Sequence, residues 1–299
     1  METRVLQIDK VCHWFGDHWV LFDVNLQIAA GQVVAVVGPS GCGKSTLLRA
    51  ILGTHPPCAG EVRADGKRIE RPSRDVGIVY QDYSLYDFLT AQQNVAFGPM
   101  LDQTDPDFRF FRYLRWRRLR RRHMKQAARL LARLGLAEAM KLYPSEMSGG
   151  MRQRVAIAQA LIMRPRVLLL DEPFGALDEA TREGLQMMLL KLYQENLEAK
   201  ARNRPPPHTI LIVTHELNEA LYVADRVVGL SQHHAQGDQG ATIVYDKAAP
   251  VFHPSDPREY RLFLQQKEEL RRVVFEPDQV KDYQQYISFW HEYQKTHGT

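Results

Sequence analysis

The stretch Val33-Val-Ala-Val-Val-Gly-Pro-Ser-Gly-Cys-Gly-Lys-Ser-Thr46 decides the fold class of this chain. Its five leading apolar residues predict a buried strand, the glycines predict a tight loop, and a helix is expected over residues 44–52. Successive backbone N–H groups of such a loop point inward at phosphate oxygens, and the helix N-terminus adds partial positive charge. We therefore expect a nucleoside triphosphate to bind at Gly38, Pro39, Ser40, Gly41, Cys42, Gly43, Lys44, Ser45 and Thr46.

Two side chains at the start of that helix carry the chemistry of the loop. Lys44 is expected to reach the β- and γ-phosphates, and the Ser45 hydroxyl is expected to ligate Mg²⁺. What the protein does with the triphosphate depends on the motifs downstream of the loop.

The composition is that of a soluble globular chain with one unusual segment. Apolar runs of about five residues are far shorter than the roughly 18 needed to span a bilayer, and the three cysteines have no pairing or metal-binding spacing. We therefore expect a reduced, cytosolic chain whose membrane role would come through a partner. The formal net charge is +4, but residues 109–125, from Arg109 to Lys125, hold eight arginines, one lysine and no acidic residue. The remainder is therefore acidic, unlike a globally basic nucleic-acid-binding protein.

Strand-like and helix-like stretches alternate along most of the chain. Strands are predicted over 32–37, 76–80, 166–170 and 209–213, and helices over 44–52, 124–134, 151–163 and 180–201. This alternation predicts an α/β fold with a mostly parallel sheet, in which ligands bind beyond the carboxyl ends of the strands. Each predicted strand is followed by a polar group, so we expect Gln81, Asp171-Glu172 and Thr214-His215 to meet the phosphate loop at one edge.

The two ends of the chain are expected to differ from this core. The first thirty residues alternate apolar and polar side chains, which predicts a small antiparallel sheet joined to the core. We expect one nucleotide-binding domain over residues 1–250, with a helical subdomain over about 82–165, a basic insert over about 101–125, and a helical extension over 251–299.

The motifs after the phosphate loop resemble those of ATP-binding cassette (ABC) proteins. Ser148-Gly-Gly-Met-Arg-Gln-Arg154 resembles their signature motif, and Arg166-Val-Leu-Leu-Leu-Asp-Glu172 resembles their Walker B strand. Gly175-Ala-Leu-Asp178 resembles their D-loop, and Thr214-His215 their switch histidine. The resemblance covers about residues 3–247 and implies ATP as the nucleotide and a P-loop NTPase fold of the RecA-like type, with an antiparallel β-subdomain and a helical signature subdomain.

Two positions depart from the commonest wording of these motifs. Met151 stands where glutamine is usual, and this wording resembles importer ATPases of the nitrate, taurine and aliphatic-sulfonate group. Gly175 stands where many members have serine, a change that we expect to be tolerated.

The residue types at the strand ends predict ATP hydrolysis. Asp171 ends an apolar strand and is expected to hold Mg²⁺, while Glu172 beside it is expected to polarise the attacking water as general base. His215 is expected to orient that water and donate to the γ-phosphate, and Gln81 to contact both Mg²⁺ and the water. For adenine stacking, the family favours Phe15, an aromatic directly before glycine, and Trp14 is the alternative; either ring could instead belong to the core.

The signature motif predicts a second anion site on the same chain. Ser148, Gly149 and Gly150 precede a helix whose N–H groups are exposed. The resemblance implies that this site acts in trans, so that two copies pair head-to-tail and each closes the ATP of the other, with Asp178 at the seam. A plain helix cap would explain the serine but not the paired glycines.

The resemblance also implies separate partner subunits. Two permease subunits would dock in a groove after Gln81, at the cytoplasmic face of the inner or plasma membrane, and an extracytoplasmic binding protein would deliver the substrate. The basic insert would suit an anionic membrane surface or the permease, nucleic acid, or simply a solvated helix face. Near the C-terminus, Tyr283 to Tyr293 form one helical stripe for packing or docking, and His233-His234 is a weak candidate for metal binding.

Three functions remain open at this point. The leading one is the energy-coupling ATPase of an importer for a small solute of the nitrate, taurine or sulfonate type. A soluble ABC protein acting on nucleic acid or ribosomes is disfavoured, because the chain has neither two cassettes nor a long coiled-coil insertion. A lipid-transport or export ATPase with a separate permease is the third.

Overall fold

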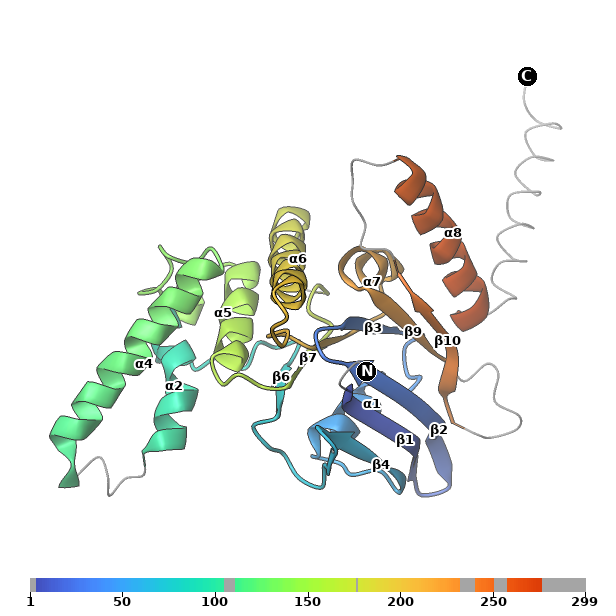
Figure 1. Ribbon diagram of the computed structural model, residues 1–299, viewed down its shortest axis with the longest axis horizontal. Coiled ribbons are helices and arrows are strands. Elements are labelled where there is room, and N and C mark those ends of the chain that lie inside the picture. The colour runs from blue at the N-terminus through green and yellow to red at the C-terminus, as the bar shows by residue number, and fades with distance from the viewer. Residues whose placement is uncertain (1–3, 105–110, 176, 232–239, 250–256, 276–299) are drawn as a thin grey trace.

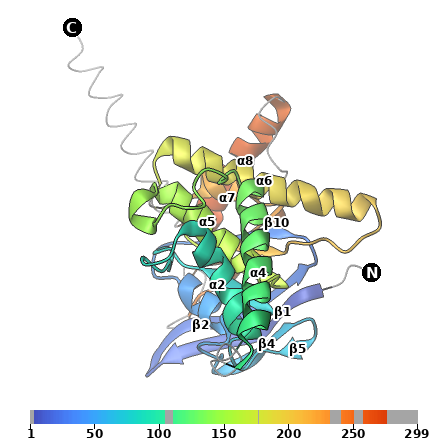
Figure 2. The ribbon, with the colours of Figure 1, turned by 90° about the vertical axis from the view of Figure 1, so that its left-hand side faces the viewer.

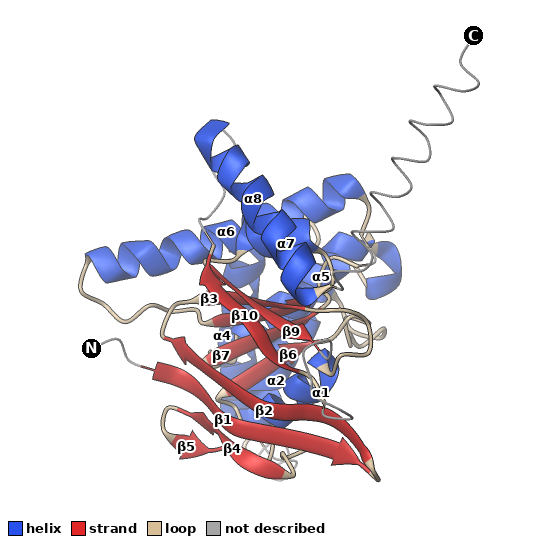
Figure 3. Cartoon of the chain, turned by 90° about the vertical axis from the view of Figure 1, so that its right-hand side faces the viewer, coloured by secondary structure: helices blue, strands red, loops and turns tan. Residues whose placement is uncertain are grey.

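The core of the protein is a six-stranded sheet with the strand order β10-β9-β3-β8-β7-β6 (Figure 3). The computed structural model describes all residues except 1–3, 105–110, 176, 232–239, 250–256 and 276–299. The core strands are β3 (Val33–Val37), β6 (Val76–Val79), β7 (Val167–Asp171), β8 (Ile210–Thr214), β9 (Arg226–Ser231) and β10 (Thr242–Ala248). Every pairing is parallel except that of β10 with β9. The predicted mostly parallel α/β core is therefore confirmed.

The N-terminal residues form a second, antiparallel sheet with the order β2-β1-β4-β5. Its strands are β1 (Arg4–Phe15), β2 (His18–Ala29), β4 (Ala59–Ala64) and β5 (Lys67–Arg68). A bridge between Leu21 and Ala241 ties β2 to the core, where the Phe22 N–H donates to the Ala241 carbonyl at 2.9 Å. The predicted antiparallel subdomain is confirmed.

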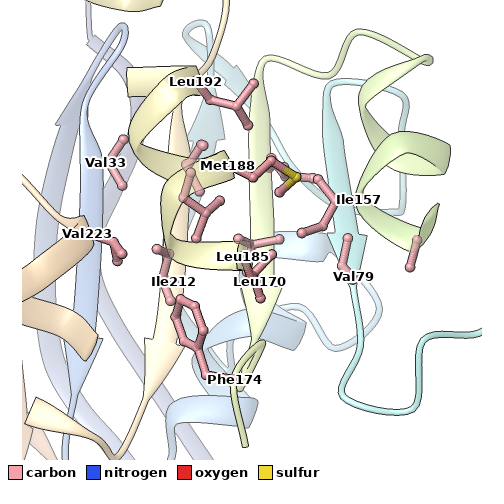
Figure 4. Packing of buried hydrophobic residues seen from close by; sticks show 14 of the residues in the cluster. Val33, Val79, Ile157, Leu170, Phe174, Leu185, Met188, Leu192, Ile212 and Val223 are labelled. Carbon is pink, nitrogen blue, oxygen red and sulfur yellow. The ribbon is translucent and has the colours of Figure 1, made fainter. Parts of the chain in front are cut away.

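Both faces of the central strands β3, β7 and β8 are buried, which explains why these strands are almost entirely apolar. Within β3, Val33, Ala35 and Val37 face the cluster beneath the larger helices, and Val34 and Val36 face the antiparallel sheet and helix α1 (Lys44–Leu52). Figure 4 shows the first cluster, in which helix side chains interleave with those of the strands. The loop after β3 is therefore held on a strand that is packed from two sides.

The helices separate into two groups (Figure 1). One group lies beside β6, away from the rest of the core, and contains α2 (Ala91–Gln103), α4 (Tyr113–Arg133), the short η1 (Pro144–Glu146) and α5 (Gly149–Leu161). The other covers the sheet with α6 (Glu179–Ala201), α7 (Leu217–Val223) and α8 (Pro257–Val274). Helix α4 begins eleven residues before the predicted start at Met124, so the described part of the basic insert continues this helix (Figure 2).

Helix α8 packs against β9, β10 and α7. Leu270 and Val274 are fully buried, and Gly229 in β9 makes room for Val274, because a Cβ at that glycine would overlap the Val274 side chain. The predicted aromatic stripe from Tyr283 to Tyr293 and the pair His233-His234 lie outside the described residues. No helix in the described part of the chain has the length and apolar character needed to cross a bilayer.

Candidate functional site

The register of the sheet brings the four predicted polar strand ends to one edge. Val37 pairs with Thr214 and Val213 pairs with Asp171, and on the next strand Leu170 pairs with Val79. The residues that follow these strands therefore emerge in one row: the glycine loop, His215, Glu172 and Gln81. This row is the carboxyl edge of the parallel strands, where open α/β sheets bind ligands.

The glycine loop needs glycine for two different physical reasons. Gly41 and Gly43 have φ values of 81° and 96°, in the left-handed region that favours glycine. Gly38 has an ordinary φ, but a Cβ there would meet the Leu230 carbonyl oxygen and would lie 2.7 Å from the Cys42 Sγ. Burial raises the pKa of the Cys42 thiol, so this side chain acts as a neutral packing group beneath the loop.

Lys44 extends its ammonium group across the loop. Its Nζ donates to the carbonyl oxygens of Gly38 at 2.8 Å and Pro39 at 2.9 Å, and the side chain is almost fully buried. Ser45, the next residue, is exposed at the same edge. The loop therefore presents one held cation and one accessible hydroxyl, which are complementary to phosphate oxygens and a divalent cation.

Two adjacent carboxylates end β7 with different surroundings. Burial raises the pKa of Asp171, the Glu172 charge raises it further, and Arg49 and Lys44 act in the opposite direction. Asp171 therefore lies within electrostatic reach of the loop cation. Glu172 has a φ of 47°, in the left-handed region, and its N–H donates to the Val213 carbonyl at 2.9 Å. This turn at Glu172 redirects the chain at the end of the strand.

The Glu172 carboxylate contacts two of the other predicted site residues. Its Oε2 lies 2.6 Å from the His215 Nδ1. A Cβ placed on Gly175 would lie 3.7 Å from the Gln81 Nε2 and 3.8 Å from the Glu172 Oε2, so the glutamine amide and the carboxylate border the same glycine. These distances are ordinary van der Waals contacts and the φ of Gly175 is not positive, so a serine would fit there.

The two candidate adenine-stacking residues have different surroundings. The Trp14 ring packs against Trp19, with centroids 4.8 Å apart, and is half-buried. Phe15, at the end of β1, is 52% exposed and has one face near His13, with centroids 4.8 Å apart. The accessible ring is therefore Phe15.

The predicted signature residues form the start of α5, apart from the phosphate loop. The Ser148 Oγ accepts from the Met151 N–H at 3.3 Å as the N-cap. Gly150 packs against Thr181 so closely that a Cβ on the glycine would overlap the Thr181 methyl group. Figure 1 shows α5 and α1 apart, with β6 and β7 between them. The structure thus does not bring Ser148, Gly149 and Gly150 to the loop of their own chain.

Asp178 caps the helix that follows the predicted D-loop. Its Oδ1 accepts from the Thr181 N–H at 3.0 Å, and this hydrogen bond holds the pKa of the Asp178 carboxyl below its usual value. Because Thr181 also contacts Gly150, the starts of α5 and α6 are packed together.

A buried carboxylate behind the site was not predicted. Glu219 in α7 accepts from the Thr214 hydroxyl at 3.3 Å and lies 3.3 Å from the Arg182 Nε, and Arg182 also donates to the Leu177 carbonyl at 3.3 Å. Burial raises the pKa of Glu219 to about 7, although Arg182 acts in the opposite direction. Together, Thr214, Glu219 and Arg182 connect the strand end that carries His215 with the start of α6. Its residues are far apart in sequence and form no motif, so sequence reasoning had no signal for them.

A groove of about 550 Å³ lies between β6 and the helical group. It begins two residues after Gln81 with Tyr83 and Ser84, and its other lining residues come from the β5–β6 connection, β6, α2 and α5 and the turn after α5. Gly98 of α2 and Met163 line it side by side, because a Cβ on Gly98 would lie 3.0 Å from the Met163 Sδ. Next to it, the aromatic residues Tyr86 and Phe88 are exposed on the surface.

An ATP-binding cassette has these features: a phosphate loop, carboxylates at the end of another core strand, and a second glycine motif that begins with a helix-capping serine. Comparison with known proteins supports this class. The chain belongs to the ABC transporter family, whose profile matches residues 21–175.

Its relatives include the aliphatic sulfonates import ATP-binding protein of Xanthomonas axonopodis, which is 36% identical over 266 residues, covering 89% of this chain and 94% of that protein. The bicarbonate transport ATP-binding protein of Synechococcus elongatus is 43% identical over 71% of this chain and 69% of its own length. The taurine import ATP-binding protein of Escherichia coli O157:H7 is 40% identical over 76% of this chain and 80% of its own.

Solved structures agree with the fold. A dimeric ATP-binding cassette in a post-hydrolysis state, bound to ADP and Pi, superimposes with a TM-score of 0.61 at 28% identity, covering 83% of this chain and all of that one. The cbiO1 subunit of Clostridium perfringens superimposes with a TM-score of 0.66 at 23% identity, over 93% of this chain and 97% of that chain, and supports the fold alone.

Proposed function

We propose that this chain is the ATP-hydrolysing, energy-coupling subunit of an importer. The matched relatives are named as import or transport ATP-binding proteins, and the ABC cassette to which the chain belongs is an ATPase. The observation that carries the proposal is the 2.6 Å contact between Glu172 and His215 at the strand edge beside the phosphate loop. A carboxylate and an imidazole in contact at this edge can position and deprotonate a water molecule.

Each predicted site residue has a role in this proposal. Lys44 holds the β- and γ-phosphates, and Glu172 accepts the proton of the attacking water while His215 keeps the carboxylate in place and contacts the γ-phosphate. Phe15 stacks on the adenine. When bound, Mg²⁺ neutralises charge on the phosphates.

The residues around the loop fit that cation. Ser45, Asp171 and Gln81 offer a hydroxyl, a carboxylate and an amide oxygen at one edge, and hard cations prefer such oxygen ligands. Asp171 also lies within electrostatic reach of Lys44, the group that holds the phosphates.

Two copies of the chain are proposed to form the complete ATP site. The start of α5 lies apart from its own phosphate loop. Ser148, Gly149 and Gly150 would therefore meet the γ-phosphate bound to the partner, with Asp178 at the seam. Support comes from the solved cassette, which is a dimer. ATP binding would then close the two copies, and hydrolysis would release them.

The work of closure would pass to two separate permease subunits. The groove after Gln81 joins the site to the helical group, and its mixed apolar lining suits a short helix of a partner. This arrangement would hold the chain at the cytoplasmic face of the membrane, and the permease would receive its solute from an extracytoplasmic binding protein. If it is correct, co-expressed permease will increase the fraction of the chain that is recovered with membranes.

The proposed substrate is a small oxyanion of the nitrate, taurine or sulfonate type. The relatives are named for aliphatic sulfonates, taurine, bicarbonate and sulfate or thiosulfate, all of which carry an oxyanion group. The permease and the binding protein would make the choice among these, because no residue of the ATPase subunit would contact the solute.

Substitution of Glu172 tests the proposal. Glu172→Gln removes the base but keeps the shape, so we expect hydrolysis to fall by roughly 10²- to 10⁴-fold while ATP binding persists. Glu216→Gln is the matched control, because Glu216 is more exposed and lies 3.8 Å from the other ring nitrogen of His215. Phosphate release and nucleotide binding are measured on the same samples. Hydrolysis that survives in Glu172→Gln, or falls equally in both variants, would contradict the proposed role.

A further inference from the structure

The basic segment of α4 is not used by the proposed site. Its arginines are all exposed, and within the described part of the chain no carboxylate lies within ion-pair distance of them: Arg115, Arg117, Arg118, Arg120, Arg121 and Arg122. Exposed helices usually mix the two charge signs, and like charges three or four residues apart destabilise a helix. A ligand of opposite charge would offset this repulsion.

Apolar side chains gather at the end of α4 that precedes these arginines. Phe111 is 79% exposed, Leu114 is 70% exposed, and Tyr113 is also exposed, with its ring 5.7 Å from that of Trp116. Trp116 and Leu119 are half-buried instead. The exposed apolar side chains are therefore confined to the start of α4, an apolar tip in which Arg112 is also exposed, and the turns that follow form a basic shaft.

This tip lies at the same end of the helical group as the groove. The Gln92 Nε2, in the first turn of α2, donates to the Met124 carbonyl of α4 at 2.9 Å. The two helices run antiparallel in Figure 1, with the end of α2 toward the start of α4. Arg74, which lines the groove, pairs with Asp102 in that last turn. Figure 2 shows α4 running down to this end of the molecule. A partner seated in the groove would bring its membrane close to the tip.

We propose that the first half of α4 binds the anionic headgroups of a lipid bilayer. The arginines would pair with lipid phosphates, and Phe111 and Leu114 would enter the interface between headgroups and acyl chains. The separation of apolar tip and basic shaft matches the layering of a membrane surface. Aromatic rings among cations would also suit single-stranded nucleic acid, but the exposed aliphatic Leu114 offers no ring for a base to stack on and favours the bilayer. This contact would be additional to permease docking and belongs to the subunit itself.

Vesicle binding by the full-length chain without permease tests the proposal. We expect binding to vesicles of phosphatidylcholine mixed with phosphatidylglycerol, weak binding to pure phosphatidylcholine, and weakening by salt. Arg115→Gln, Arg118→Gln and Arg122→Gln are combined in one variant, since glutamine keeps helix propensity. At roughly fivefold per arginine, the triple variant is expected to bind on the order of 100-fold more weakly, with unchanged ATPase activity.

The control variant removes the same charge from elsewhere. Arg204→Gln, Arg271→Gln and Arg272→Gln change exposed arginines after α6 and at the end of α8, outside the first half of α4, and should leave vesicle binding nearly unchanged. A combined Phe111→Ser and Leu114→Ser variant should lose the part of the binding that persists at high salt.

Three results would overturn the proposal. They are equal binding to both kinds of vesicle, equal losses in the two triple variants, and tighter binding of single-stranded RNA than of anionic vesicles through the same arginines. Because ATPase activity is measured on each sample, a failed lipid contact is distinguishable from a failed ATPase assignment.

Discussion

Two glycine-rich segments each begin a helix in this protein, and their glycines meet different demands. Before α1, Gly41 and Gly43 have positive φ values, so the backbone itself needs glycine to curve around a ligand. At the start of α5, Gly150 has no such conformation and is required by a neighbour, because Thr181 occupies the space where a Cβ would stand. The first segment is an anion cradle shaped by its own backbone, and the second is a contact surface fixed to another helix.

This difference suggests how the two halves of the site behave. The phosphate loop is anchored on a strand that is buried on both faces, so it is a rigid half. The start of α5 is tied through Thr181 to the start of α6, and α6 is tied through Arg182 and Glu219 to the strand end that carries His215. We infer that a movement of His215 can shift residues 148–150 through α6, whereas the phosphate loop stays in place.

The largest expected effect comes from removing the loop cation. Lys44→Ala deletes the charged donor that now bridges the Gly38 and Pro39 carbonyls, and charge-assisted hydrogen bonds to phosphate would be lost. We expect ATP affinity to fall roughly 100-fold, equivalent to about 3 kcal/mol. Titration calorimetry on the isolated chain measures this loss.

Ser148→Ala is the companion variant in the other half. It removes an N-cap worth about 1 kcal/mol, but should leave ATP affinity of the monomer unchanged, because this serine is proposed to serve the partner's nucleotide. ATP-dependent dimerisation, followed by light scattering, should weaken instead. Equal losses of monomer affinity in Lys44→Ala and Ser148→Ala would show that the two halves are not separable.

An intermediate effect is expected from adding one carbon to the second segment. Gly150→Ala forces its new methyl group against Thr181, and such overpacking costs about 1–3 kcal/mol of unfolding free energy. Thr181→Ser removes the opposing methyl group, so the double variant should recover most of the loss. Urea unfolding of the two single variants and the double variant measures the coupling.

Gly184→Ala in α6 is the matched control for that substitution. Nothing lies within 4 Å of the position of its new Cβ, so the change should stabilise the helix by about 0.5–1 kcal/mol. If both Gly→Ala variants change stability in the same direction, the contact with Thr181 is not the reason for glycine at position 150.

Local patterns in the sequence were sufficient to predict the core and the row of strand ends. Buried parallel strands read as apolar runs, and the residues that follow them must share one edge, so Gln81, Glu172 and His215 could be grouped before their contacts were known. The roles assigned to these residues, the domain limits and the partner subunits stay predictions.

Contacts between distant segments could not be predicted in this way. The space beside Gly150 is filled by a residue 31 positions later, and the partner of Arg182 is Glu219 on another helix. The early start of α4 was missed for a different reason. Its inward-facing residues, Trp116, Leu119 and His123, do have a helical spacing, but they stand in a segment dominated by arginines that was interpreted as an insert.

The smallest expected effect tests the link between the halves through its pH dependence. Glu219 has a pKa raised from 4.5 to about 7 by burial, and Arg182, Glu216 and His215 are the charged groups around it. The folded state therefore holds the proton of Glu219 more tightly than the unfolded state, so the contribution of this group to stability is full below pH 4.5 and is lost as pH rises through 7. From pH 6 to 8 the loss is about 1 kcal/mol.

Glu219→Gln should remove this dependence, because the amide does not titrate. Burial also raises the pKa of Asp225, to about 6. The contribution of Asp225 will still fall as the pH rises toward 6, so only the part of the stability profile above that pH should flatten. Thermal unfolding of both proteins from pH 5 to 8 measures the difference. If Glu219→Gln also slows hydrolysis while the ATP affinity is unchanged, the Glu219 carboxylate supports the position of His215. If the pH profile flattens with hydrolysis unchanged, α6 stabilises the fold without connecting the two halves.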